Sequence, residues 1–186
     1  MERTDFRALR DALSEDEVLS ARKKIFEALK SIFDAREFKT VLTYYPRGHE
    51  LDVGEFNEYV LGKGVKVAFP RVDSKSHDIY FYEVNSLEDF DKGTFGLMEP
   101  KPDTKRVYIE PRDAFGSPET SSVLCVTPGV AFDSRKNRMG YGAGYYDKFF
   151  LANMGIYKVG CAYSCQMVEK LEIKPHDVKM NEVIVV

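Results

Sequence analysis

The chain has 186 residues, of which 44% are hydrophobic and 31% charged, and its formal net charge is −3. These proportions are ordinary for a globular protein and the length suits one core, so we expect a single domain over residues 1–186. The acidic balance argues against a nucleic-acid-binding protein, which usually carries a basic stripe. No apolar run approaches the roughly 18 residues that span a bilayer. Residues 1–7 lack the apolar region of a signal peptide, so we expect a cytoplasmic protein without a membrane partner.

Helix and strand patterns alternate along the chain. Ser14–Glu17 matches a capping box, and apolar residues then recur with a helical period as far as Ile32. After this helix we expect a strand at 40–45, a helix between Asp52 and Gly62, and a strand at 65–69 that stops at Pro70. A strand at 78–82 and an irregular stretch at 90–102 follow. The remaining expected elements are a strand at 122–126, a helix from Tyr145, and strands at 158–162 and 182–186.

Strands and helices that alternate with short connections predict parallel strand pairing. The expected fold class is therefore α/β, a single domain with a mostly parallel sheet flanked by helices in a Rossmann-like three-layer arrangement. Ligands gather at the carboxyl ends of the strands in such sheets. The segments 45–50, 70–71, 127–133 and 163–166 each follow a predicted strand, and we expect one crevice to collect them.

A glycine-rich loop follows the strand at 122–126. It holds Gly140, Gly142 and Gly144 and leads into a helix, an order that recurs in phosphate sites because helix N–H groups face the anion. The spacing matches neither G-x-G-x-x-G nor the P-loop, and a mobile turn is the alternative. Basic and acidic neighbours favour a nucleotide phosphate site with Mg²⁺. These neighbours are Arg135, Lys136, Arg138, Asp133 and Asp147.

Two further carboxylates are candidates for ligand binding. Glu50 is either a solvated loop residue or an acceptor for the N–H groups of a flat heterocycle, which the tyrosine rings at 45, 141, 145 and 146 would face. Asp177 follows His176 and suits a metal better than a catalytic pair, provided that the fold brings it to Asp147. We expect His49 and His77 at the surface, and Cys125 and Cys161 as small buried residues. These residues indicate a nucleotide, Mg²⁺ and a second, flat ligand.

The stretch P-G-V-A-F-D-x-x-x-N-R-M-G-Y-G-A-G-Y-Y-D at 128–147 resembles the signature of the 5-formyltetrahydrofolate cyclo-ligase (methenyltetrahydrofolate synthetase) family. Weaker blocks at 44–52, 69–71, 95–100 and 175–183 follow in the family's order. The resemblance implies ATP-dependent conversion of 5-formyltetrahydrofolate to 5,10-methenyltetrahydrofolate, with release of ADP and phosphate. In that reaction the formyl oxygen is phosphorylated, N10 attacks the activated carbon, and phosphate departs.

The resemblance also implies roles for particular residues. Arg138, as a charge clamp, and Tyr145, at the boundary between the substrates, are the residues implied in catalysis. Positions implied for ATP are Arg3, Arg138, Met139, Gly140, Tyr141, Gly142, Ala143, Gly144, Tyr145 and Tyr146. Positions implied for folate are Tyr45, Glu50, Tyr141, Gly142, Ala143, Gly144 and Tyr145. Positions implied for Mg²⁺ are Asp147 and Asp177.

The sequence departs from the family pattern at two places. The family opens K-x-x-[LI]-R, and here Arg3 takes the arginine position while the lysine would lie before Met1, so that Arg7 is a candidate replacement. Asn181 stands where an aspartate is common. Two alternatives are a non-catalytic nucleotide- or folate-binding homologue and an ATP-dependent ligase or kinase for another small formamide or acid. We expect a monomer.

Overall fold

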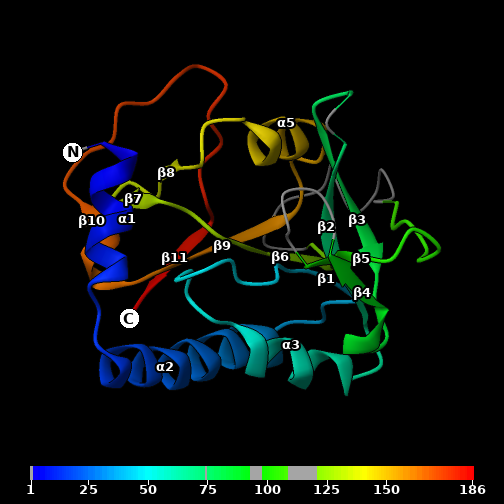
Figure 1. Ribbon diagram of the computed structural model, residues 1–186. Coiled ribbons are helices and arrows are strands. Elements are labelled where there is room, and N and C mark those ends of the chain that lie inside the picture. Colours follow the sequence, from blue (N-terminus) through cyan, green and yellow to red (C-terminus); the bar gives the residue numbers. More distant parts are fainter. Residues whose placement is uncertain (1, 74, 93–97, 109–120) are drawn as a thin grey trace.

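The structure is a computed structural model that describes residues 2–73, 75–92, 98–108 and 121–186. Its centre is a six-stranded sheet in the order β11-β9-β6-β1-β2-β3 (Figure 1). Neighbouring strands are parallel except for the antiparallel pair β2–β3. The predicted, mostly parallel sheet is thus confirmed. The strands are β1 Thr40–Leu42, β2 Lys66–Asp73, β3 Asp78–Glu83, β6 Val123–Thr127, β9 Tyr157–Ala162 and β11 Glu182–Val185.

Helices cover both faces of this sheet (Figure 1). The helices are α1 Arg3–Asp11, α2 Glu15–Asp34, α3 Gly54–Leu61 and α5 Tyr145–Ala152. Alternate residues of β1 point to opposite faces: Val41 packs with buried residues of α2 and α3, and Leu42 packs with Phe150 of α5. The three layers that the sequence predicts are therefore present.

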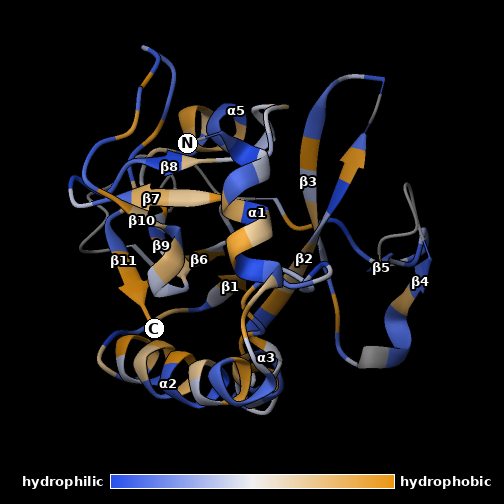
Figure 2. Cartoon of the chain, turned by 60° about the vertical axis from the view of Figure 1, so that its left-hand side comes forward, coloured by the Kyte–Doolittle hydropathy of each residue, from blue (hydrophilic) through white to orange (hydrophobic). Residues whose placement is uncertain are grey.

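The capping box that starts α2 is confirmed. Glu17 N donates to Ser14 Oγ, and Ser14 N donates to Glu17 Oε2 at 2.8 Å. In Figure 2, α2 alternates between blue and orange around its turns, and its apolar side faces the sheet. No helix in the described part of the chain is long and apolar enough to cross a membrane.

Two small sheets extend the core. The first, β10-β7-β8, consists of Met167–Val168, Ala131–Asp133 and Arg138–Met139, and the second pairs β4 Phe90–Lys92 with β5 Met98–Pro100. Single 3-10 turns, η1 Leu87–Asp89 and η4 Ser164–Gln166, complete the described elements. Helix α1 packs beside the first small sheet, where Phe6 joins a buried cluster with Val130, Ala131 and Leu171.

Three expectations about elements were wrong. Strand β2 does not stop at Pro70 but runs to Asp73, because β1 ends opposite Ala68 and leaves β2 paired there with β3 alone. A proline fits such an edge, where its missing N–H is not needed. Part of 90–102 is the β4–β5 hairpin instead of irregular chain, and 93–97 lie outside the described residues. The N-terminal segment, for which we predicted no element, forms α1.

The two predicted buried cysteines are confirmed as core residues. Cys125 and Cys161 are 0% and 2% exposed and lie in β6 and β9. Burial raises the pKa of the Cys125 thiol to about 12, so this thiol stays protonated at neutral pH and is a poor nucleophile.

Candidate active site

A cavity of about 420 Å³ lies at the carboxyl ends of the central strands. Its walls come from residues 44–50, from β2, β3 and β5, and from the glycine-rich loop with the first turn of α5. It collects three of the four predicted segments, with Pro70 and Pro128 as the contributions from 70–71 and 127–133. The fourth, 163–166, forms η4 and packs against α1 instead, because α1 occupies that end of the sheet.

The glycine-rich loop has backbone conformations that require glycine. Gly142 and Gly144 have φ values of 109° and 71°, in the left-handed region that other residues rarely adopt. Gly144 is also the N-cap of α5, so the loop delivers the chain directly into the helix N-terminus. At Gly140 a Cβ atom would lie 2.8 Å from Arg138 Nη1, so here the glycine makes room for a side chain. The first N–H groups of α5 therefore border the cavity behind an exposed loop.

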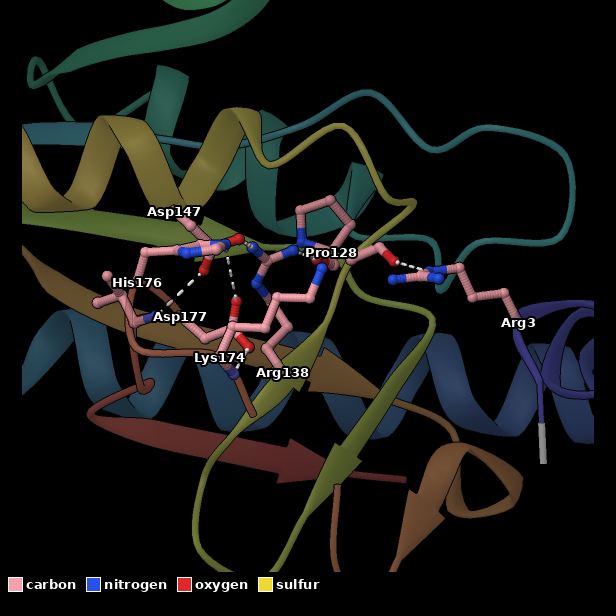
Figure 3. Close-up of polar contacts among 9 residues, drawn as sticks. Arg3, Pro128, Arg138, Asp147, Lys174, His176 and Asp177 are labelled. Carbon is pink, nitrogen blue, oxygen red and sulfur yellow. Dashed lines mark hydrogen bonds and ion pairs between the residues drawn. The ribbon is translucent and has the colours of Figure 1, made fainter. Parts of the chain in front are cut away.

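Arg138 and Asp147 form a buried ion pair beside this loop. Arg138 Nη2 lies 3.0 Å from Asp147 Oδ2, and the two side chains are 3% and 12% exposed. Figure 3 shows Arg138 between this carboxylate and the carbonyl of Pro128, which accepts from Nη1 at 3.5 Å. Arg138 Nε is buried and has no hydrogen-bond partner among the described residues. The guanidinium that we expected as a charge clamp thus already has a carboxylate against it.

Asp177 belongs to a loop that is anchored to Asp147. The backbone N–H of Val178, the next residue, donates to Asp147 Oδ1 at 3.1 Å (Figure 3). One oxygen of Asp177 accepts from Lys174 N at 2.7 Å. The backbone next to Asp177 thus contacts Asp147, but the Asp177 carboxylate bonds within its own loop, so the condition that the fold bring Asp177 itself to Asp147 stays a prediction. Within the described ranges no three His, Cys, Asp or Glu side chains are grouped to hold a metal. Mg²⁺ commonly takes one or two carboxylates together with substrate phosphates, so the residue type of Asp147 and Asp177 suits this ion, and a site shared by the two stays a prediction.

Asp133 does not belong to the site, contrary to expectation. Its carboxylate accepts from Asn137 Nδ2 and Arg135 N, each at 2.9 Å, and from Leu171 N at 3.0 Å. Burial alone would raise the pKa of Asp133, but these hydrogen bonds hold the pKa below its ordinary value. Asp133 thus ties the β7–β8 turn to the chain at Leu171. Of the basic neighbours, Lys136 also points elsewhere, since its Nζ donates to the carbonyl of Asn181 at 2.7 Å.

Glu50 and Tyr141 connect the two sides of the cavity. Glu50 is 8% exposed, its Oε2 accepts from Arg47 N at 2.8 Å, and its Oε1 accepts from the hydroxyl of Tyr141. Burial and the adjacent carboxylate of Glu50 raise the pKa of Tyr141 to about 12, so the hydroxyl keeps its proton. The interpretation of Glu50 as a merely solvated residue is therefore wrong.

Comparison with known proteins assigns the chain to a family. The model of the 5-formyltetrahydrofolate cyclo-ligase family matches residues 1–186. The chain belongs to this family. It is 30% identical over 149 residues to the 5-formyltetrahydrofolate cyclo-ligase of Escherichia coli, covering 78% of this chain and 76% of that protein. It is 25% identical over 186 residues to that of Haemophilus influenzae, covering 98% and 95%.

A solved structure has the same fold. The NMR structure of Aquifex aeolicus 5,10-methenyltetrahydrofolate synthetase superimposes with a TM-score of 0.78 at 32% identity, covering 98% of this chain and 87% of that one. This likeness extends the cyclo-ligase family assignment from sequence to architecture, and it makes the chain a ligase-family enzyme.

The predicted cyclo-ligase residues are unevenly placed around the cavity. Most of them line the cavity, and among these Tyr45 is 44% exposed. The predicted residues that line the cavity are Tyr45, Glu50, Arg138, Gly140, Tyr141, Ala143, Gly144, Tyr145, Tyr146 and Asp147. Met139, Gly142, Arg3 and Asp177 are not among the lining residues. Arg3 instead donates from Nε to the carbonyl of Gly140 at 2.9 Å (Figure 3), and Met139 packs against the buried cluster around Phe6.

Two site residues were missed from the sequence. Arg10 on α1 donates to the hydroxyl of Tyr141 at 3.3 Å, and Glu99, 5% exposed, lines the cavity. Arg10 follows Phe6 by one helical turn, so helical spacing in the N-terminal segment was the available signal. Glu99 lies within the block at 95–100 that we compared with the family, but its residue type alone predicts a solvated charge.

Proposed function

We propose that the protein is an ATP- and Mg²⁺-dependent 5-formyltetrahydrofolate cyclo-ligase. Its products are 5,10-methenyltetrahydrofolate, ADP and phosphate. The observation that carries the proposal is the contact between Glu50 and Tyr141, which brings a buried carboxylate against the glycine-rich loop in a cavity of about 420 Å³. A carboxylate suited to a heterocycle and a loop suited to phosphate are thus close enough for one ligand to react with the other.

The reaction needs an electrophile that a formamide does not provide. Transfer of the γ-phosphoryl group from ATP to the formyl oxygen converts that oxygen into a leaving group and releases ADP. The folate N10 then attacks the formyl carbon and loses its proton to solvent, the five-membered ring closes, and phosphate departs with the original formyl oxygen. The protein's part is to align the oxygen with the phosphorus and to balance charge, as in other phosphoryl transfers.

Folate binding is assigned to the side of the cavity formed by Tyr45 and Glu50. Glu50 accepts hydrogen bonds from the N–H groups of the pterin with the lone pairs that Tyr141 and Arg47 N leave available. The exposed ring of Tyr45 supplies an apolar face for the flat ring system. Residues 141–145 form the boundary with the nucleotide, and Tyr145 lines the cavity there.

ATP binding is assigned to residues 138–146 and to Arg3. The backbone N–H groups of the loop and of the first turn of α5 receive the phosphates, which the helix dipole favours. Arg3 holds the loop at Gly140 and adds a positive charge at its edge. Asp147 and Asp177 would hold Mg²⁺, which neutralises phosphate charge when bound. Arg138 orients Asp147 and offsets its charge.

One assay tests the proposal. Purified protein is mixed with ATP, Mg²⁺ and 5-formyltetrahydrofolate, and the absorbance of the methenyl product is followed. We expect a signal that requires all three components. Folded protein that produces no ATP-dependent signal would contradict the assignment. A non-catalytic homologue would bind folate or ATP in separate titrations without turnover, and a ligase for another formamide would respond only in a substrate panel.

A further inference from the structure

Arg10 is a buried cation to which the proposed chemistry gives no role. It follows Phe6 by one helical turn on α1, and the two residues are 5% and 2% exposed. Arg10 Nη1 lies 3.3 Å from the hydroxyl of Tyr141, and its Nε is buried without a hydrogen-bond partner among the described residues. A buried charged donor with incomplete bonding destabilises a fold, so packing alone does not account for an arginine here.

The directions of the hydrogen bonds around Tyr141 are determined by chemistry. A phenol has one proton, and a guanidinium can only donate. Because Glu50 is an acceptor, the Tyr141 proton points to Glu50 Oε1 and its oxygen accepts from Arg10. The result is a chain of cation, hydroxyl and carboxylate that runs from α1 into the cavity. Each bond in such a chain strengthens the next by polarisation.

The backbone around Tyr141 does little to fix its side chain. Its neighbours are Gly140 and Gly142, which have no side chains to pack against it, and Gly142 has a φ value of 109°. The Tyr141 residue itself is 45% exposed. Its position therefore depends on the two contacts at its hydroxyl. Of these, only the one to Arg10 comes from outside the cavity walls.

We propose that Arg10 is a positioning residue that holds the Tyr141 hydroxyl against Glu50. The inference rests on the proposed function, because the carboxylate so positioned is the one assigned to the pterin. Arg10 touches neither substrate. It acts through Tyr141, so the loss of either side chain has the same consequence: Glu50 is no longer held in the orientation that receives folate. Arg3, which bonds the loop backbone at Gly140, contributes separately on the nucleotide side.

A double-mutant cycle tests this inference. The variants are Arg10→Gln, Tyr141→Phe and the double variant, with Lys24→Gln as a control that removes one exposed positive charge from α2. We measure KM for folate, KM for ATP, kcat, and folate affinity by titration without ATP. Each single variant is expected to raise KM for folate about tenfold, the effect of one lost charge-assisted hydrogen bond. The double variant is expected to be no worse than either single variant. Lys24→Gln is expected to behave like the unmodified protein.

The outcomes separate this inference from the proposed function. The role of Arg10 would be overturned if the increases in KM for folate of Arg10→Gln and Tyr141→Phe multiplied in the double variant. It would also be overturned if Arg10→Gln left the KM for folate unchanged. An equal rise in both KM values would indicate a structural role in α1 and would overturn it too. Should Arg10→Gln not fold, Arg10→Lys, which keeps the charge but not the planar donor fork, takes its place in the cycle. An unmodified protein that neither binds folate nor turns it over rejects the proposed function itself.

Discussion

The guanidinium of Arg138 and the carboxylate of Asp147 lie 3.0 Å apart and are both largely shielded from water. The pair joins β8 to α5 across the glycine-rich loop, and Asp147 also receives the N–H of Val178. A single carboxylate therefore connects the glycine-rich loop, the helix that follows it and the segment of Asp177. Substitution at this point affects stability and chemistry together.

Asp147→Ala is expected to lower the free energy of unfolding by about 3–5 kcal/mol, because it leaves Arg138 buried without its partner. Asp147→Asn keeps the side-chain shape and an acceptor for Val178 N, and we expect it to lose less stability but to lose Mg²⁺-dependent turnover as well. Urea denaturation and turnover are measured for both, with exposed Asp103→Ala as the control. Unaltered stability of Asp147→Ala would mean that the ion pair contributes nothing to the fold.

Glu50→Gln is expected to raise KM for folate about tenfold and to leave KM for ATP nearly unchanged, because the amide replaces an ionised acceptor of pterin N–H groups. Glu55→Gln removes the same charge from an exposed position on α3 and serves as the control. Steady-state kinetics with each substrate varied in turn gives both constants. A matching rise in KM for ATP would contradict the assignment of Glu50 to the folate side.

Gly144→Ala tests what the left-handed backbone conformation of Gly144 contributes to stability and to the KM for ATP. Gly144 has a φ value of 71° and free space where a Cβ would lie, so alanine introduces left-handed strain of about 1–2 kcal/mol without a clash. We expect a lower urea midpoint and a higher KM for ATP. Gly62→Ala, at the right-handed C-cap of α3, tests the same chemical change without that strain and should neither lower the urea midpoint nor raise the KM for ATP. Equal behaviour of the two variants would contradict a conformational role for Gly144.

The carboxylate of Asp78 makes part of the protein's stability depend on pH in the acid range. Its hydrogen bond with Lys148 lowers the pKa of Asp78 to about 2, well below the ordinary value. A carboxyl with a depressed pKa stabilises the fold above its unfolded pKa and loses this contribution as the pH falls. The difference in urea midpoint between the unmodified protein and Asp78→Asn should therefore shrink between about pH 4 and pH 2. A constant difference over that range would show that the carboxylate charge is not involved.

Asp177→Asn is expected to raise the Mg²⁺ concentration needed for half-maximal turnover, because an amide is a weaker ligand than a carboxylate. The control is Asp103→Asn, at an exposed position. Chelation of divalent cations with EDTA should abolish turnover of the unmodified protein, and added Mg²⁺ should restore it. A half-maximal concentration that Asp177→Asn leaves unchanged would remove this residue from the proposed metal site.

Much of the fold followed from local patterns in the sequence. The capping box at Ser14 and the strand at 122–126 are decided by neighbouring residues, and both are present as predicted. The extension of β2 through Pro70 depends on where β1 ends, which no pattern in β2 reveals. Helix α1 depends for its stability on packing against distant parts of the chain, and a short isolated helix is marginal in water.

The site was predictable in its parts but not in its connections. The glycines and Glu50 are recognisable from residue type and spacing. The pairing of Arg138 with Asp147 is not, because two charged residues in an expected phosphate site are equally compatible with separate roles. Asp133 was wrongly predicted to belong to the site for a related reason. Its carboxylate accepts four hydrogen bonds, three from Arg135 and Asn137 in the same turn and one from Leu171, far along the chain. Such partners are known only once the chain is folded.

The two contacts of α1 with the loop also bear on how the protein is made. They join residues separated by 137 and 131 positions, so α1 cannot dock until the loop at 140–141 has been synthesised. Contacts between distant parts of a chain form late, after shorter-range structure has organised. Helix α1, which contacts the glycine-rich loop from outside the cavity walls, is thus translated well before the loop on which its final position depends.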